Sequence, residues 1–294
     1  MKRLLFYFLM ACALFISGNN IDYAKAAGRD LSMQHIRNAT IKLTSGDTTF
    51  LIDPMFAEVG AYEGFPDTYR SWLRNPLTPL PIPVKDILEG VDAVILTHTH
   101  LDHWDKAAQE ALPKDIPLYV QNEKDAQAVR GQGFTNVRIM KDSDEFGKVK
   151  MDRTATQHGS KAMYADPALG KALGEVMGVV FTTPEGKKAW LVGDTIWFEG
   201  VDEALAKHKP NVIIVNAGAA AMSDKKYKDA PEIIMDKEDV RKMVEKMPGS
   251  DVVAIHMDAI NHMTVDRKDL SEYVRKHGIR DKVLIPFDGE KMDF

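Results

Sequence analysis

The sequence predicts an α/β fold in which sheets and helices pack in layers. Short runs rich in β-branched residues alternate with longer runs of helical composition along most of the 294 residues. The run DAVILT at 92–97 has a continuous apolar centre, which is typical of a strand buried on both faces of a sheet. A hydrophobic content of 45% with 28% charged residues is that of a folded globule and shows no bias towards disorder.

The first predicted elements form a β-hairpin. ATIKLT (39–44) and TTFLID (48–53) are separated by the turn residues SGD. The connection that follows, 54–90, is rich in proline and aromatic residues, and connections of this length within a domain are usually functional or cover a site. After it come the strand at 92–97 and a run of helical composition at 105–112.

Seven further strands and three further helices complete the predicted order. The strands are expected at 117–121, 136–140, 148–156, 177–183, 188–194, 211–218 and 251–257. The helices are expected at 201–209, 237–247 and 267–277. Because we find neither a low-complexity linker nor a clear internal repeat, we predict one catalytic domain over 27–294.

Residues 1–26 are predicted to be a signal peptide. Lys2 and Arg3 precede an apolar run, 4–17, that is shorter than the roughly 20 residues needed to span a bilayer. The sequence Ala-Lys-Ala at 24–26 has the small-x-small pattern of a cleavage site. We therefore expect an exported protein, periplasmic or secreted, without a stable membrane span after cleavage. Cys12 lies in a poor match to a lipid-acceptor site, so a lipoprotein is the less favoured interpretation.

Three histidines and two aspartates follow the strand at 92–97 within the sequence THTHLDHWD. A spacing of two places His98 and His100 on the same side of an extended chain, so both imidazoles can reach one metal ion. Asp102 and His103 lie where the chain turns into a helix and can face a second ion nearby. Asp105 is better explained as an early-helix residue, since negative charge is favourable at a helix N-terminus.

Composition limits the other kinds of chemistry. The only cysteine lies in the predicted signal peptide, so the mature chain has no thiolate nucleophile, no disulfide and no cysteine-bound zinc. Any metal must be held by His, Asp or Glu, a ligand set that suits Zn²⁺, Mn²⁺ or Fe²⁺ better than Ca²⁺. A net charge of −5 lacks the basic excess of nucleic-acid-binding proteins, so a small-molecule substrate is expected.

The motif THTHLDH resembles the signature of the metallo-β-lactamase-fold hydrolases. That family has a further histidine downstream, for which ATQHGS supplies His158, and an aspartate in a G-D-T turn, for which WLVGDT supplies Asp194. It ends with a histidine after an apolar strand, for which VVAIHM supplies His256. The resemblance covers essentially the whole mature chain. It implies a four-layer αββα sandwich, with two mixed β-sheets flanked by helices.

The resemblance also implies a ligand set for two divalent ions. His98, His100 and His158 would hold one ion, and Asp102, His103 and His256 would hold the other. Asp194 would bridge them. Zn²⁺ is the expected metal, with Mn²⁺ and Fe²⁺ as alternatives.

The opening strands are similar to one branch of this family, which includes ascorbate-6-phosphate lactonases and phospholipase D-type phosphodiesterases. That branch often has the sequence GHAT where this chain has Asn38 in place of the histidine. Asp53, in LIDP, resembles a carboxylate that orients a ligand histidine. A turn or cap role for Asp53 before Pro54 is the alternative.

Two ions of this kind can share a hydroxide, which would attack an ester, a lactone or a phosphodiester. Asp102 or Asp194 could relay a proton to the leaving group. The alternatives are a β-lactam hydrolase, a redox or sulfur-transfer enzyme, and a non-catalytic protein of the same fold. The aspartate at 194 argues against the antibiotic-hydrolysing subclass that has a cysteine ligand. The chain has no spare length for the extra domain that redox and sulfur-transfer branches usually carry.

Four further residues are candidates for contact with the substrate: His262, Trp104, Trp197 and Tyr62. His262 follows the predicted ligand His256 by six positions. A solvated or capping role is the alternative for this histidine, and packing in the core or in a lid is the alternative for the aromatic residues.

Overall fold

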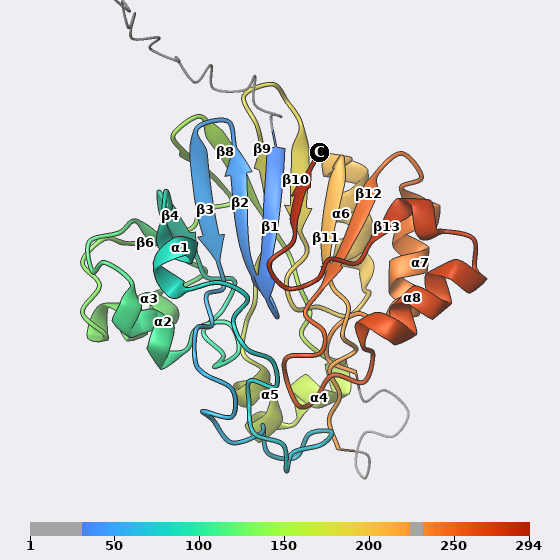
Figure 1. Ribbon diagram of the computed structural model, residues 1–294, viewed down its shortest axis with the longest axis horizontal. Helices are drawn as coiled ribbons and strands as arrows, with labels where there is room; N and C mark the ends of the chain where they lie inside the picture. Colours follow the sequence, from blue (N-terminus) through green and yellow to red (C-terminus); the bar gives the residue numbers. More distant parts are fainter. Residues whose placement is uncertain (1–30, 224–231) are drawn as a thin grey trace, which may run out of the picture.

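Two seven-stranded sheets pack face to face, and helices cover their outer faces (Figure 1). This architecture is that of a computed structural model, which describes residues 31–223 and 232–294. The predicted four-layer αββα sandwich is confirmed. The predicted signal peptide, with Cys12, lies outside the described residues.

The first sheet has the strand order β14-β1-β2-β3-β4-β5-β6. β2 is antiparallel to both β1 and β3, and β3 to β6 are parallel. The bounds are β1 (Leu31–Arg37), β2 (Thr40–Ser45), β3 (Thr48–Ile52), β4 (Ala93–Ile95), β5 (Leu118–Val120), β6 (Val137–Ile139) and β14 (Lys291–Asp293). The predicted hairpin is confirmed as β2 and β3, paired from Ser45 with Thr48 to Ile41 with Ile52.

The second sheet has the strand order β13-β12-β11-β10-β9-β8-β7. β10 to β13 are parallel, whereas β9 is antiparallel to both β8 and β10, so β8 runs in the same direction as β10. The bounds are β7 (Ser143–Phe146), β8 (Val149–Thr154), β9 (Gly178–Thr182), β10 (Lys188–Leu191), β11 (Val212–Asn216), β12 (Asp251–Ile255) and β13 (Val283–Leu284).

Three apolar clusters hold the four layers together. The cluster between the sheets joins Phe50 of β3 to Phe181 of β9, whose rings lie 5.2 Å apart. One outer cluster packs the first sheet against α1 (Val84–Leu88), α2 (Lys106–Ala111) and α3 (Glu123–Gly131). The other packs the second sheet against α6 (Glu199–His208), α7 (Lys237–Lys246) and α8 (Arg267–Lys276). Burial of these side chains is the main favourable contribution to folding.

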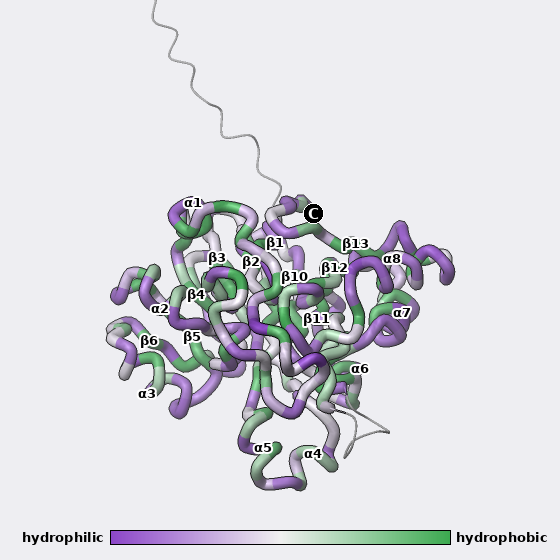
Figure 2. The backbone as a smooth tube through the Cα atoms, turned by 60° about the horizontal axis from the view of Figure 1, so that its bottom comes forward, coloured by the Kyte–Doolittle hydropathy of each residue, from purple (hydrophilic) through white to green (hydrophobic). Residues whose placement is uncertain are grey.

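A smaller unit covers one end of the sandwich. The short helices α4 (Lys161–Ala165) and α5 (Pro167–Leu173) lie beyond the ends of the strands (Figures 1 and 2), beside the connection 54–90 (Figure 1). Met163 and Leu173 of this unit pack against Met55 and Ile233. The carboxyl ends of β3, β4, β8, β10, β11 and β12 point towards this end of the molecule.

Several elements were not predicted from the sequence. β1 has an incomplete apolar alternation, because it buries His35 and Arg37. The helices α1, α4 and α5 have five to seven residues, too few for a clear helical period. The connection 54–90 contains α1 as its one regular helix among the described elements. No helix in 31–223 or 232–294 is long and apolar enough to cross a membrane.

Candidate metal centre

All seven predicted ligands lie together at the carboxyl ends of strands from both sheets. The segment 98–103 follows β4, while His158, Asp194 and His256 follow β8, β10 and β12. Because parallel strands end at the same edge of a sheet, side chains placed just after them converge. Six of the seven are buried and His100 is half-buried.

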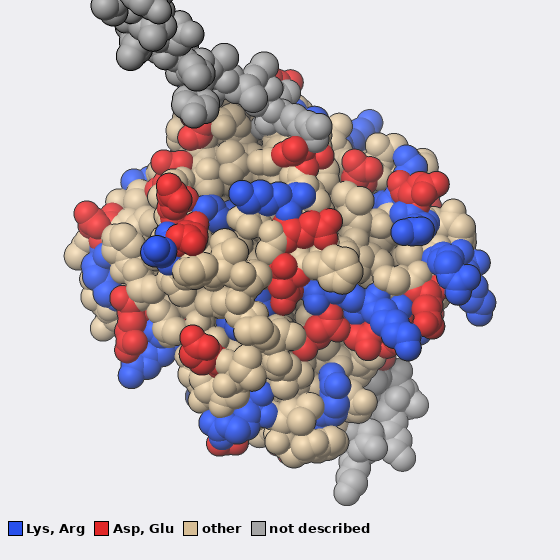
Figure 3. Space-filling view, viewed as in Figure 1, with Lys and Arg blue, Asp and Glu red and all other residues tan. Residues whose placement is uncertain are grey.

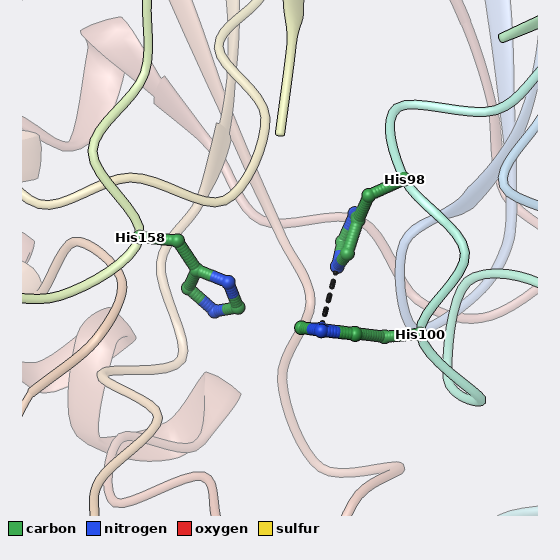
Figure 4. A group of neighbouring side chains, drawn as sticks. All are labelled: His98, His100 and His158. Atoms are coloured by element: carbon green, nitrogen blue, oxygen red, sulfur yellow. Dashed lines mark hydrogen bonds between the residues drawn. The ribbon is translucent and has the colours of Figure 1, made fainter. Parts of the chain in front are cut away.

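The first group contains His98, His100 and His158, whose rings point towards one another (Figure 4). His98 Nε2 and His100 Nδ1 lie 3.0 Å apart. The other ring nitrogens face carbonyl oxygens at the end of α5: His100 Nε2 is 2.8 Å from Ala172 O, and His158 Nδ1 is 3.3 Å from Leu173 O. Since a carbonyl oxygen can only accept, these nitrogens carry the protons, and the nitrogens that face the centre keep their lone pairs.

The second group contains Asp102, His103 and His256. His103 Nε2 and His256 Nε2 lie 2.9 Å apart, and Asp102 Oδ2 lies 3.7 and 3.5 Å from them. Asp194 lies between the two groups, because its Oδ2 is 3.2 Å from His103 Nε2 and 3.6 Å from His158 Nε2. The same oxygen is 3.9 Å from His98 Nε2 and 3.7 Å from His256 Nε2.

The electrostatics favour neutral imidazoles at most positions. Burial lowers the pKa of His98 well below its usual value, lowers that of His256, and lowers that of His158 to about 4. His103 differs: burial opposes its charged form, but Asp194, Asp102 and Asp53 raise its pKa well above the usual value.

This donor set fits divalent cations. Ring nitrogens lie close together at two places, His98 Nε2 beside His100 Nδ1 and His103 Nε2 beside His256 Nε2, and each pair is repulsive unless a proton or a cation lies between the two nitrogens. Neutral imidazole and carboxylate are also the forms that bind metal ions. Two cations, one at each group, would therefore remove the repulsion and neutralise the buried carboxylates of Asp102 and Asp194.

Asp53 holds one of these histidines from behind. Its Oδ2 accepts from His103 Nδ1 at 2.9 Å and from the Thr97 hydroxyl at 2.7 Å, while Oδ1 accepts from Thr97 N at 2.7 Å. The bond to Nδ1 directs His103 Nε2 towards the centre and fixes its tautomer. This contact is the one expected of a carboxylate that orients a ligand histidine.

We expect Asp53→Asn to weaken metal affinity and kcat/KM by about 10- to 100-fold. All three groups that bond to the Asp53 carboxylate are hydrogen-bond donors. In the asparagine variant one carboxylate oxygen becomes an NH₂ group, which is also a donor and cannot accept from the group that faces it. Metal affinity, measured by competition with a chelating dye, checks the expectation.

Asp105→Asn is the matched control. Asp105 is the N-cap of α2 and is also buried, and its carboxylate accepts from the backbone N–H groups of Ala108, Phe56 and Ala57. This substitution should lower the melting temperature and leave metal affinity unchanged. Equal metal affinities of the two variants would contradict the role of Asp53.

Two asparagines contact the site and were not predicted from the sequence. Asn216, at the end of β11, donates through Nδ2 to Asp194 Oδ1 at 2.5 Å, so that Oδ2 is left to face the histidines. Asn38 donates through Nδ2 to Asp102 O at 2.9 Å. Two signals pointed to them: Asn38 stands where the similar branch has a histidine, and Asn216 is a polar residue that ends a buried strand between two strands carrying predicted ligands.

A cavity of about 180 Å³ opens onto both groups. Its polar end is formed by His100, Asp102, His158, Asp194 and His262. Its other walls are mostly apolar, with Phe65, Pro66, Leu169, Leu173, Met222 and Ile233. No Lys or Arg occurs among the described residues that line it. A larger polar cleft of about 730 Å³ reaches only His98 and His100 of the seven.

The structure brings one of the four predicted substrate-facing residues to this cavity. His262 lines it, with its ring 4.9 Å from that of Phe65, and burial lowers its pKa to about 4. Tyr62 packs against the apolar cluster beside the cavity without lining it.

The structure corrects the predictions for the two tryptophans. Trp104 is buried in the cluster between the first sheet and its helices and donates to Gln132. Trp197 packs on the other outer cluster, beneath Lys242 and beside Asp202. Their positions close to predicted ligands in sequence did not determine which way the large rings point.

Comparisons with known proteins agree with this geometry. Residues 48–257 match the family profile described as "Beta-lactamase superfamily domain". The UPF0173 protein YddR of Bacillus subtilis (strain 168) is 39% identical over 264 residues, which cover 90% of this chain and 100% of that protein.

Two solved structures are also similar. A "possible metal-dependent hydrolase" from Veillonella parvula DSM 2008 is 41% identical with a TM-score of 0.87, over 90% of this chain and 99% of that one. The isothiocyanate hydrolase from Delia radicum gut bacteria is 46% identical with a TM-score of 0.85, over the same shares of the two chains.

Proposed function

Since the chain belongs to the metallo-β-lactamase superfamily and is a metal-dependent hydrolase, we propose that it uses two divalent cations to hydrolyse small isothiocyanates. The observation that carries the choice of substrate is the cavity beside the candidate metal centre. It reaches residues of both ligand groups and is otherwise mostly apolar. Such a cavity suits a compact, uncharged molecule with an apolar substituent.

Charged substrates fit this cavity less well. A phosphodiester brings a negative charge that proteins usually match with Arg or Lys, and the described lining contains neither. A neutral lactone or ester remains compatible with the lining. We prefer an isothiocyanate as the substrate because the isothiocyanate hydrolase from Delia radicum gut bacteria is 46% identical to this chain.

The chain's own residues hold the ions and place the reacting groups. His98, His100 and His158 would bind one cation, and Asp102, His103 and His256 the other, with Asp194 Oδ2 between them. Cations held by these residues would supply hydroxide near neutral pH. Asn216 fixes the orientation of Asp194, and the apolar walls exclude bulk water from the substituent.

The reaction balances without an oxidant. Hydroxide forms a C–O bond to the central carbon of R–N=C=S, and the C=N π electrons move to nitrogen, which takes a proton. Asp102 and Asp194 are the carboxylates placed to move this proton. The hydroxyl proton of the adduct R–NH–C(=S)OH then moves to the same nitrogen as the C–N bond breaks, which releases the amine R–NH₂ and carbonyl sulfide, so that the net reactants are one isothiocyanate and one water.

The test is hydrolysis of benzyl isothiocyanate by protein loaded with Zn²⁺, followed as loss of the isothiocyanate and appearance of benzylamine. A lactone, a phosphodiester and a β-lactam are assayed in parallel, and Asp194→Ala corrects for spontaneous hydrolysis. We expect kcat/KM to be highest for the isothiocyanate. A higher kcat/KM for any of the other three would overturn the proposed substrate class.

A further inference from the structure

Asn38 touches both chain segments that supply the second ligand group. Its Nδ2 donates to Asp102 O at 2.9 Å, and this carbonyl belongs to the peptide that joins Asp102 to His103. Its own carbonyl oxygen accepts from His256 N at 3.0 Å. Thus one residue, in the turn between β1 and β2, connects the backbone of all three members of that group.

Asn38 is itself firmly held. It is fully buried, and His35 Nε2 donates to its carbonyl oxygen at 3.0 Å. His35 is also fully buried, and its Nδ1 lies 3.5 Å from Arg267 Nη2. Arg267 in turn bonds to Asp258 and Asp288. The backbone of Asn38 is therefore held by buried hydrogen bonds that extend through His35 to Arg267, although Asn38 lies in a turn.

The backbone at these positions is unusual. Asn38 has φ 58° and His256 has φ 62°, in the left-handed region that side chains other than Gly and Asn rarely adopt. Such conformations persist where surrounding contacts hold them and are frequent at functional sites. The hydrogen bond from His256 N to Asn38 O joins these two residues directly.

A turn role alone does not explain the asparagine. Glycine serves a positive φ without cost, whereas Asn38 Oδ1 finds no donor among the described residues although it is buried. Because this buried acceptor has no donor among those residues, the side-chain amide of Asn38 costs stability relative to a glycine at the same position. The bond from Nδ2 to Asp102 O is the one hydrogen bond of this side chain in the described structure that offsets it.

We propose that Asn38 is a positioning residue for the second cation: it sets the relative placement of the 102–103 peptide and of His256, so that their side chains converge. The inference rests on the proposed binding of two ions. It assigns no contact between Asn38 and the ion itself.

The test is titration of metal-free protein with Zn²⁺ against a chelating dye, which yields two dissociation constants. Asn38→Gly keeps the positive φ and the backbone carbonyl but removes the Nδ2 donor. We expect one of the two affinities to fall by about 10- to 100-fold, with the other changed by less than about threefold. Asn38→Asp, which also tolerates this φ, should lose at least as much, because a carboxylate oxygen then faces Asp102 O.

Ser250→Ala is the matched control. Ser250 is also buried, and its hydroxyl donates to Pro210 O at 2.6 Å, with no hydrogen bond to a predicted ligand in the described part of the chain. This variant should lower the melting temperature and leave both dissociation constants unchanged. If both Asn38 variants behave in the same way as Ser250→Ala, Asn38 has only a structural role and the inference is overturned. Wild-type protein that binds fewer than two ions would overturn the proposed binuclear function, and this inference with it.

Discussion

Asp194→Ala is expected to lower kcat/KM by about 10³-fold or more while the protein stays folded. Asp194 Oδ2 lies within 4 Å of ring nitrogens from both ligand groups, so its removal would affect both of the proposed cations at once. Metal ions contribute several kcal/mol to the stabilisation of charge in transition states of hydrolysis, which corresponds to a change of this size in rate.

Several contacts argue that this variant folds. Asp194 lies after β10 and belongs to none of the three apolar clusters that hold the layers together. Burial opposes its ionised form, but His103 and His256 hold its pKa well below the usual value, so loss of the carboxylate should lower the melting temperature without removing any part of these clusters. The measurement is steady-state kinetics together with metal content and the circular dichroism spectrum.

Asp202→Ala serves as the control for loss of a carboxylate. Asp202, on α6, is bonded to Lys246 and to the indole of Trp197 and does not line the substrate cavity. It should retain wild-type kcat/KM. An Asp194→Ala protein that keeps full activity would rule out the placement of Asp194 between the two ions.

Removal of the metal ions is expected to abolish activity and to lower the melting temperature by on the order of 10 °C. Without cations, His98 Nε2 and His100 Nδ1 remain 3.0 Å apart and two buried carboxylates lose their counter-charge. A ligand at about 1,000 times its Kd stabilises the native state by about 4 kcal/mol, from which the shift in melting temperature follows.

The experiment is dialysis against a chelator, with metal analysis before and after. Separate additions of Zn²⁺, Mn²⁺ and Fe²⁺ then show which ion restores both activity and melting temperature, and how many equivalents are needed. Treatment with the chelator already saturated with Zn²⁺ controls for effects of the chelator itself. Activity that survives after metal analysis shows no bound ion would contradict the proposed mechanism.

On the face seen in Figure 3, basic and acidic side chains are interspersed, so no region of a single charge indicates a binding surface for a charged partner there. The chemistry of the chain is concentrated at the end of the sandwich that α4 and α5 cover (Figure 1). There the C-terminal carbonyls of α5 fix the tautomers of His100 and His158. The covering unit therefore contributes to the metal centre as well as to the cavity.

Local patterns in the sequence determined the strands and the candidate ligands. Buried strands produce continuous apolar runs, and polar residues placed directly after such runs must lie at a sheet edge. This is why the cluster after the strand at 92–97, with His98 and His100, could be identified from the sequence itself, whereas His158, Asp194 and His256 were assigned through the resemblance to the metallo-β-lactamase-fold family. The signal peptide and the export of the protein remain predictions from the same kind of local pattern.

Tertiary structure alone decided which residues support the ligands and which line the cavity. Asn38 meets Asp102 and His256 across separations of 64 and 218 positions, and no periodicity records such contacts. The cavity joins Phe65, Leu169, Met222 and His262 from four separate segments. Trp104 and Trp197 lie close to predicted ligands in sequence but do not line the cavity. Rotation about their backbone and side-chain bonds directs each ring into an apolar cluster. Short-range order follows from composition and spacing, whereas the shape of the site depends on how the two sheets pack.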